Sequence, residues 1–489
     1  MKRGMLWLGS ATALTRLLDV GATLIVLALL TREELGTAAL VLSVGAVVES
    51  VSGVGLGHAL IQAPKLTRDE EHSLFWLTGG IGLLLGTVMV AISPLVAWAY
   101  ALPALIPMVA VSGMKLCLVG AAVVPHQLLS KHLKFREAGA VQTLSTAGEG
   151  LMKIGLAAAG FGAWALVLAS VFRGAVLLVS ALLLSRFVPR LHFAWREVRG
   201  YLSFGVRIAT SGLLYQCYKN ADYFLVGKIL GVEVLGIYRA AFDLAMQPLE
   251  MVLNVVNRVA YPVYAKIASD RAALKTALLR STRSLTLMCA PLVAFLYFAA
   301  GDLLAVITHE RWGAAEPAVQ LLVWGGLLRG AAHLFPQMYV AAGRPGYAVV
   351  DSAVSLVLLV TAFYCGLTFL PEMGVLSVCW AWIVVYPGLL QLHLVLTRRI
   401  MPMGTLEYLR ALAPAFGGAT AMVLAMAATV PLELHRSGPL VSLLIWAAVG
   451  LGVYAGYLRL VLKIGLSDLA PERQVRTGEA AQPGAPDDG

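Results

Sequence analysis

The most informative side chains in this sequence are the ionisable ones that lie inside long apolar segments. The stretch 201–267 holds two such segments, joined by the short turn 231–236, and it includes Lys219, Asp222 and Arg239. Each segment has about 25–30 residues, which is enough to cross a bilayer with some tilt. An ionised group at membrane depth usually faces a polar cavity or another charge. This hairpin therefore indicates a helix bundle that handles something polar or ionic.

Charged residues of both signs occur at this depth throughout the chain. The basic ones are Arg16, Lys115, Lys153, Arg173, Arg207, Lys219, Lys228, Arg239, Arg258 and Arg329, and the acidic ones are Asp19, Glu49, Glu149, Asp222, Asp243, Glu250 and, less deeply, Asp351. Some opposite charges are three or four residues apart, which places both partners on one face of a helix. These pairs are Arg16 with Asp19, Glu149 with Lys153, Lys219 with Asp222, and Arg239 with Asp243. One interpretation is that they are structural ion pairs that make insertion tolerable.

The remaining cations favour a second interpretation. Lys115, Arg173, Arg207, Arg258 and Arg329 have no acidic residue at such a spacing. Cations of this kind inside a bundle suit a multivalent anionic ligand such as a pyrophosphate, which Lys and Arg bind well. An acid beside a cation suits coupling to a proton or another cation.

Other kinds of site have no signal in the sequence. There is no HExxH or GxSxG motif, and the five cysteines lie in apolar stretches without metal-ligand spacing. We expect buried thiols, no metal site, no cofactor and no enzymatic activity. The net charge of +10 alternates from loop to loop. A nucleic-acid-binding protein would gather it on one soluble face, so we expect no nucleic-acid partner.

Composition places these residues in a polytopic membrane protein. Of the 489 residues, 59% are hydrophobic and 13% are charged, against about 25% charged in soluble proteins. The apolar segments are helix-length, which predicts an all-α fold. We predict fourteen spans: about 5–30, 36–62, 74–100, 104–129, 138–160, 162–185, 202–229, 235–265, 284–301, 314–341, 347–369, 373–396, 411–430 and 438–462. We expect the first to be an uncleaved span.

The loops predict the orientation of these spans. Loops and tails on the side of the N-terminus hold 24 Lys and Arg residues, whereas the opposite loops hold 3. The basic side faces the cytoplasm, and an even number of spans puts both termini there. We expect the run 266–283 to form a basic surface helix near anionic lipid. The tail 466–489 has the composition of a disordered segment.

A short internal repeat divides the predicted spans into two halves. The sequence Glu-Glu-Leu-Gly at 33–36 follows the first span, and Glu-Val-Leu-Gly at 233–236 follows the seventh. Repeats of this kind are typical of transporters. We predict an N-lobe at 1–186, a cytoplasmic connection at 187–200, a C-lobe at 201–397, and two further spans at 398–465.

Several longer stretches resemble a known family. They are GVGLGHALIQAPKLTRDEEHSLFW at 53–76, the segment 134–174, PRLHF at 189–193, YLSFG at 201–205, NADYFLVGKILGVEVLGIYRAAFDLAMQP at 220–248 and VAYPVYAKIASD at 259–270, with weaker matches at 310–312 and 343–345. They are similar to the polysaccharide transporter family of the multidrug/oligosaccharidyl-lipid/polysaccharide flippase superfamily, especially to colanic-acid-type oligosaccharide flippases. The resemblance covers about residues 5–400.

The resemblance implies two six-helix lobes related by a pseudo-two-fold axis around a central cavity. It implies alternating access that moves an undecaprenyl-pyrophosphate-linked oligosaccharide from the cytoplasmic to the periplasmic leaflet of the inner membrane, with cation or proton coupling in some members. Polymerases and glycosyltransferases of the same pathway are the implied partners. The family has no catalytic motif to carry across. From depth and charge, we assign Arg16, Lys115, Lys219 and Arg258 to the pyrophosphate or sugar, and Asp19, Glu149 and Asp222 to coupling with H+ or Na+.

Three alternatives remain open at this point. A peptidoglycan-precursor flippase would share a positive cavity. A cation-coupled drug antiporter of the same superfamily would need a more acidic, aromatic one. A membrane glycosyltransferase or polymerase typically needs a large external loop with catalytic acids, but the longest external loop predicted here, 302–313, holds only Asp302 and Glu310.

Overall fold

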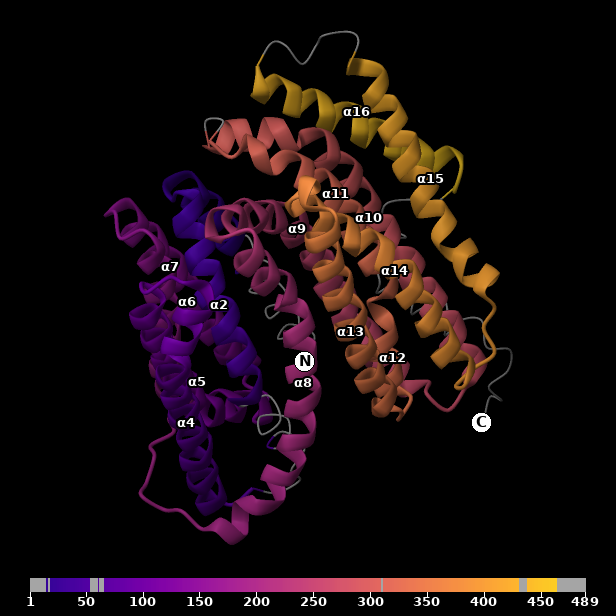
Figure 1. Cartoon of the computed structure of the whole chain (residues 1–489). Helices are drawn as coiled ribbons and strands as arrows, with labels where there is room; N and C mark the ends of the chain where they lie inside the picture. The colour runs from indigo at the N-terminus through magenta and orange to yellow at the C-terminus, as the bar shows by residue number, and fades with distance from the viewer. Residues whose placement is uncertain are drawn as a thin grey trace, which may run out of the picture. The chain divides into compact units, whose positions relative to one another are not determined.

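The computed structural model describes residues 15, 18–52, 60, 66–308, 311–430 and 438–463 (Figure 1). This part of the chain is all-helical, with fourteen labelled α-helices, the shorter helix Leu18–Leu29 and two short 3-10 segments. Ten segments are long and apolar enough to cross a membrane. The predicted fold class, an all-α polytopic membrane protein, is therefore confirmed.

The chain forms two compact units, Met1–Arg239 and Ala240–Gly489. The helices of unit 1 are α2 (Arg32–Ser52), α4 (Arg68–Tyr100), α5 (Leu105–Lys131), α6 (Phe135–Ala158), α7 (Ala163–Ser185), α8 (Trp195–Ile229) and the first turns of α9 (Val232–Lys266), together with the shorter helix Leu18–Leu29. Unit 2 holds the rest of α9, α10 (Arg271–Thr308), α11 (Glu316–Ala332), α12 (Leu334–Ala341), α13 (Pro345–Phe369), α14 (Val375–Arg398), α15 (Thr405–Thr429) and α16 (Pro439–Leu460). The predicted lobe boundaries stay predictions.

Helices occur at all fourteen predicted spans, but some have different ends. The predicted span 314–341 consists of two helices, α11 and α12, which meet at His333. The basic run 266–283, predicted as a separate surface helix, mostly belongs to α10, which continues through it into the span. Most of the predicted loop 302–313 is also helical, because α10 extends to Thr308. A sequence window places a span by its apolar centre and cannot see where a polar end stays helical.

Reciprocal capping boxes start two of the helices. Thr67 accepts a hydrogen bond from the backbone of Glu70, and the Glu70 carboxylate accepts one from the backbone of Thr67 at 2.8 Å. Thr31 and Glu34 make the same exchange before α2, with the Thr31 N–H donating at 2.8 Å. Each box satisfies backbone donors that a helix start leaves free.

Close glycine contacts join α4 to α5 in unit 1. A Cβ added to Gly82 would lie 2.5 Å from the Leu116 carbonyl oxygen, and one added to Gly120 would lie 2.7 Å from that of Thr78. Gly86 and Gly113 oppose each other in the same way one to two turns further along. Apolar side chains give little driving force between helices in lipid, so small residues that permit close backbone approach are a common solution.

The segment between α7 and α8 is attached to the beginning of α4. The Trp76 indole N–H donates to the carbonyl oxygen of Arg190 at 2.8 Å, and the Ala194 N–H donates to the Ser73 hydroxyl at 3.1 Å. Hydrogen bonds at Arg190 and Ala194 therefore attach this segment to α4.

In unit 2, the last two helices pack on α10. Met422, Met426 and Trp446 share a buried apolar cluster with residues of α10. The Trp446 indole donates to the Asp302 carboxylate at 3.0 Å, and the Tyr454 hydroxyl donates to the Leu287 carbonyl.

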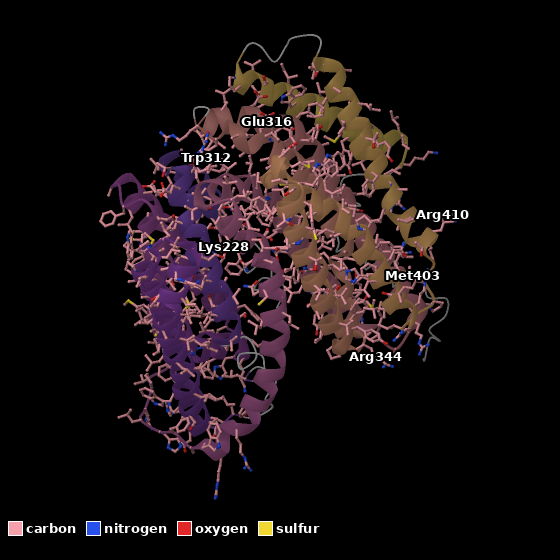
Figure 2. The ribbon with its side chains drawn as sticks, viewed as in Figure 1. Lys228, Trp312, Glu316, Arg344, Met403 and Arg410 are labelled. Atoms are coloured by element: carbon pink, nitrogen blue, oxygen red, sulfur yellow. The ribbon has the colours of Figure 1, made fainter. Side chains whose placement is uncertain are left out.

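In Figure 2, Trp312 and Glu316 lie toward one end of unit 2, and Arg344, Met403 and Arg410 lie toward the other. The α11–α12 segment thus runs the length of the unit.

Candidate functional site

Three ion pairs in unit 1 bring six of its intramembrane charges together. Lys115 Nζ lies 2.7 Å from Glu49 Oε2. Arg173 Nη1 lies 3.0 Å from Glu149 Oε2. Lys153 Nζ lies 3.2 Å from Asp19 Oδ1 and also donates to the Thr23 hydroxyl at 3.2 Å. We call these six charged residues the ion-pair row.

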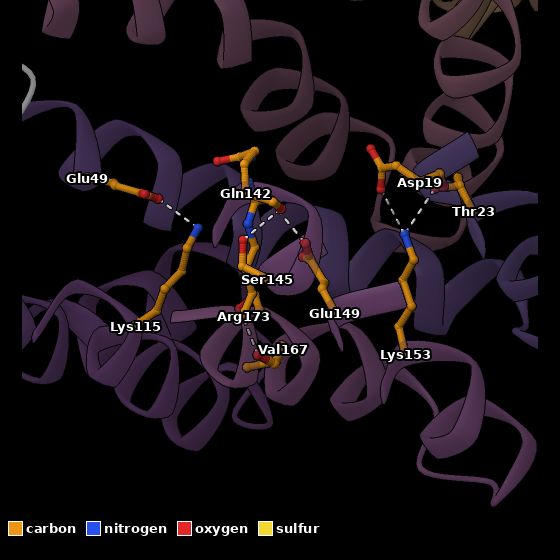
Figure 3. Close-up of polar contacts among 11 residues, drawn as sticks. Asp19, Thr23, Glu49, Lys115, Gln142, Ser145, Glu149, Lys153, Val167 and Arg173 are labelled. Carbon is orange, nitrogen blue, oxygen red and sulfur yellow. Dashed lines mark hydrogen bonds and ion pairs between the residues drawn. The ribbon is translucent and has the colours of Figure 1, made fainter. Parts of the chain in front are cut away.

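The ion-pair row is drawn in Figure 3, and its members come from five helices. Asp19 and Thr23 come from the helix Leu18–Leu29, Glu49 from α2, Lys115 from α5, Arg173 from α7, and Glu149 and Lys153 from α6. Residues four apart lie on one helical face, so α6 presents its two charges side by side, one toward α7 and one toward the first helix. Since α5, α6 and α7 pack on one another and α2 packs on α5 and α7, the row crosses the bundle.

The cations of the row differ in how accessible they are. The Lys153 side chain is only 7% exposed, whereas those of Lys115 and Arg173 are 23% and 38% exposed. A buried ammonium is tolerable only when it is paired. Lys153 therefore suits a structural role, whereas Lys115 and Arg173 can exchange a carboxylate for another anion without leaving a fully buried charge.

These contacts change the pairing expected from spacing. Glu149 and Lys153 were predicted to pair within one helix, but Glu149 contacts Arg173 and Lys153 contacts Asp19. Lys115 and Arg173, which have no partner on their own helices, find acids on neighbouring ones. The predicted residues Lys115, Asp19 and Glu149 are thus brought into one row.

The predicted residue Asp222 lies in a different setting, on α8. Its side chain is completely buried, and its carboxylate accepts a hydrogen bond from the Tyr238 hydroxyl at 2.7 Å and from the Tyr223 N–H at 2.9 Å. The Arg239 guanidinium lies over the Tyr223 ring, 5.4 Å from its centroid. Lys219 lies on the same helix, three residues earlier, and is partly buried.

Two further predicted residues lie wholly or partly outside the described structure. Arg16 is outside the described residues, so its predicted pairing with Asp19 stays a prediction. The backbone of Arg258 is part of α9, but its side chain is not among those described. The backbone of Arg207 is likewise part of α8, and its side chain is not among those described.

The charged residues of unit 2 also pair between helices. Arg329 on α11 lies 3.7 Å from Glu250 on α9, and Lys275 on α10 lies 2.7 Å from Glu407 on α15. Within the described ranges, no three His, Cys, Asp or Glu side chains converge as a metal site would require, and the five cysteines are free thiols.

Three members of the ion-pair row, Glu49, Lys153 and Arg173, were predicted to be intramembrane charges but were not assigned as site residues. Their depth was visible in the hydropathy pattern. Their shared location was not, because it depends on which helices pack together. A pattern of charges at matching depths on several spans is the signal that could have found them.

The comparisons with known proteins agree with this architecture. A family model described as "Polysaccharide biosynthesis protein" matches residues 25–317, which is more than half of the chain. The chain is 26% identical over 342 residues to the teichuronic acid biosynthesis protein TuaB of Bacillus subtilis (strain 168), covering 68% of this chain and 69% of TuaB. It is 26% identical over 312 residues to the succinoglycan biosynthesis transport protein ExoT of Rhizobium meliloti (strain 1021), covering 63% of each.

A likeness to a solved structure identifies the fold. The inward closed conformation of the lipid II flippase MurJ matches with a TM-score of 0.76 at 12% identity, covering 94% of this chain and 99% of MurJ. The all-α membrane fold predicted from the sequence thus has a counterpart among solved structures. Helices, buried charges and sequence similarity lead to one conclusion: the chain is a multi-pass membrane protein that belongs to the polysaccharide biosynthesis protein family.

Proposed function

We propose that this protein is a flippase that moves an undecaprenyl-pyrophosphate-linked oligosaccharide from the cytoplasmic to the periplasmic leaflet by alternating access. ExoT is by name a transport protein and MurJ a lipid II flippase, and both support a transport reading of the shared family and fold. The transported oligosaccharide would be used to build a surface polysaccharide, as the names of TuaB and ExoT suggest.

The observation that carries the proposal is the ion-pair row. Its accessible cations, Lys115 and Arg173, are each held by one carboxylate. A diphosphate offers several anionic oxygens, and it would compete with Glu49 and Glu149 for these cations. An exchange of this kind lets the protein bind the headgroup without a permanently unpaired charge at membrane depth.

The alternative functions fit the charged residues less well than the proposed one. A drug antiporter that takes cationic compounds would need accessible acids in excess, whereas the row contains three cations and three acids. A peptidoglycan-precursor flippase also carries a pyrophosphate, so it differs from the proposal in its glycan and not in its headgroup. A glycosyltransferase would need catalytic acids, and the described end of the predicted loop 302–313 uses Asp302 to bind Trp446.

Several finer assignments belong to the same proposal. We place the protein in the bacterial inner membrane with both termini in the cytoplasm, in agreement with the distribution of basic loops. Coupling to H+ or Na+ through Asp19, Glu149 and Asp222 remains a prediction, as do sugar or pyrophosphate contacts of Arg16, Lys219 and Arg258. Polymerases and glycosyltransferases of the same pathway are the expected partners.

The test replaces each accessible ion pair by a neutral pair. The double variants are Lys115→Gln/Glu49→Gln and Arg173→Gln/Glu149→Gln. Each removes both charges of one ion pair, so neither partner keeps a charge that the other no longer balances. We expect normal membrane abundance but roughly tenfold or greater loss of polysaccharide export, since a charge-assisted contact to phosphate contributes more than about 1.4 kcal/mol. Export is measured as surface polysaccharide in a host that lacks its own flippase.

The matched control is Lys275→Gln/Glu407→Gln. That pair has the same 2.7 Å separation as Lys115 and Glu49, but it lies at the polar starts of α10 and α15. It should leave export unchanged. Full export from both unit 1 double variants at normal abundance would show that the row is structural and would remove the basis of the proposal.

A further inference from the structure

Unit 2 contains a buried acid–imidazole pair that the proposed function does not use. Asp351 on α13 and His393 on α14 face each other, with His393 Nε2 located 3.4 Å from Asp351 Oδ1. Their side chains are 10% and 5% exposed. Both lie one to two turns inside helices that are apolar enough to span a membrane. An ionisable pair in such a place is costly and therefore calls for a function.

The surroundings of His393 hold the ring in one orientation. Its imidazole stacks on the Phe335 ring, with centroids 4.9 Å apart and an angle of 4° between the planes. The Tyr339 hydroxyl donates to the backbone carbonyl of His393 at 2.9 Å. Phe335 and Tyr339 both belong to α12. The pair therefore connects α13 and α14 directly and α12 through these two aromatic residues.

In the described part of the chain, His393 is the one basic side chain that forms an ion pair with Asp351. The titratable side chains beside the pair are the phenols of Tyr339, Tyr347 and Tyr408, which contact one another or Phe335. Arg329 on α11, which also packs against α14, is engaged by Glu250. Glu372, in the 3-10 turn Pro371–Met373, lies at the far ends of α13 and α14. Ser355, one turn along α13, hydrogen-bonds the Asp351 carboxylate.

Two atoms of the pair have unused hydrogen-bonding capacity. In the described part of the chain, His393 Nδ1 and Asp351 Oδ1 are buried without a hydrogen-bond partner. Buried polar atoms in native structures are normally satisfied, so each exception calls for an explanation. A pair that served packing alone would gain by closing the 3.4 Å gap or by satisfying Nδ1. An arrangement that leaves both atoms without a hydrogen-bond partner is instead suited to gaining and losing a proton.

We propose that Asp351 and His393 together form a proton-binding site in unit 2. With one added proton, the pair is neutral overall, either as an imidazolium beside a carboxylate or as a neutral ring beside a carboxylic acid. Without it, a single negative charge remains in a buried site between helices.

A site of this kind can act on helix packing. Loss of the proton leaves the Asp351 carboxylate in need of water or a new donor, which favours separation of α13 from α14. Gain of the proton favours the packed arrangement. If the protein is the transporter proposed above, on which this step rests, proton binding here would bias the helices of unit 2 between two arrangements. This site is distinct from the coupling residues Asp19, Glu149 and Asp222, all of which lie in unit 1.

The experiment measures proton binding itself and does not depend on transport. Full-length protein with ¹⁵N-labelled histidine is purified in detergent micelles, and its imidazole resonances are followed by NMR from pH 5 to pH 9. The His393→Gln variant identifies the signal of His393 among the nine histidines. We expect this signal to titrate within the range, and we expect Asp351→Asn to move or abolish the titration. Asp351→Glu keeps the carboxylate and should preserve the titration, and it also serves if Asp351→Asn does not fold.

Two controls define the outcomes. Asp302→Asn removes a carboxylate that binds Trp446 elsewhere in unit 2 and should leave the His393 titration unchanged. Replacing choline chloride with sodium chloride should also leave it unchanged, because the site is proposed for protons. A His393 signal that does not change between pH 5 and pH 9, or a change that Asp351→Asn does not alter, would overturn the proposal. So would competition by sodium. None of these results bears on whether the protein is a flippase, which the unit 1 double variants test separately.

Discussion

Gly36 and Gly236 face each other at the beginnings of α2 and α9, and each lies against the backbone of the other helix. A Cβ added to Gly36 would lie 1.8 Å from the Val232 carbonyl oxygen, and one added to Gly236 would lie 1.9 Å from the Arg32 carbonyl oxygen. The contact is reciprocal, and the residues on its two sides are 200 positions apart. The short repeat at 33–36 and 233–236 therefore marks two equivalent helix starts that meet.

The first prediction concerns this contact. Gly36→Ala and Gly236→Ala should each force the two helix starts apart, because the added methyl group meets backbone and not a side chain that can move. Overpacking of this kind costs about 1–3 kcal/mol, so we expect a lower unfolding temperature in detergent and reduced export. Gly45→Ala on the same helix is the control, since a Cβ there has open space. Equal behaviour of the three variants would contradict the close approach.

The second prediction compares the two halves of one ion pair. Asp19→Asn leaves Lys153 charged and almost fully buried, whereas Lys153→Met leaves Asp19 with a side chain that is 35% exposed. Removing one partner of a fully buried pair costs about 3–5 kcal/mol, and partial exposure reduces that cost for the carboxylate. We therefore expect Asp19→Asn to lower membrane abundance more than Lys153→Met. The double variant Asp19→Asn/Lys153→Met should recover most of the lost membrane abundance. A larger loss for Lys153→Met than for Asp19→Asn would contradict the conclusion that Lys153 is the more buried partner.

The third prediction tests the hydrogen bond to the buried carboxylate of Asp222. Tyr238→Phe removes the hydroxyl that donates to it at 2.7 Å. A hydrogen bond to a charged group contributes about 1.5–3 kcal/mol, so the variant should unfold at a lower temperature. In an Asp222→Asn background the same change should cost less, because the partner is then uncharged. Tyr215→Phe on α8, an exposed tyrosine, should have no effect in either background.

The fourth prediction concerns orientation. Arg271 begins α10, and Gly313 follows its far end. The basic-loop bias places position 271 in the cytoplasm and position 313 outside. A membrane-impermeant maleimide should therefore label Gly313→Cys in intact cells with a permeable outer layer, and should label Arg271→Cys only after lysis. The unsubstituted chain, with its five cysteines, measures the background. If only Arg271→Cys were labelled in intact cells, the orientation would be the opposite of the one predicted.

The sequence by itself determined the class of the protein, the places where helices occur and the short repeat at 33–36 and 233–236. These properties depend on local patterns. A run of apolar residues is long enough to span a membrane or it is not, and the run's own composition decides this. The same holds for the capping box before α4, where Thr67 and Glu70 are three residues apart. The sequence motifs also predicted the family, which the match over residues 25–317 confirmed.

Only the tertiary structure decided which charges meet. Spacing predicted that Glu149 would pair with Lys153, since both lie on one face of α6. The structure turns Glu149 toward Arg173 on α7 and Lys153 toward Asp19 on the first helix. Side chains one turn apart on a helix gain only about 0.2–0.5 kcal/mol from each other, so an acid or a base on a neighbouring helix easily outcompetes them at depth. Which neighbour that is depends on helix packing, which local sequence does not reveal.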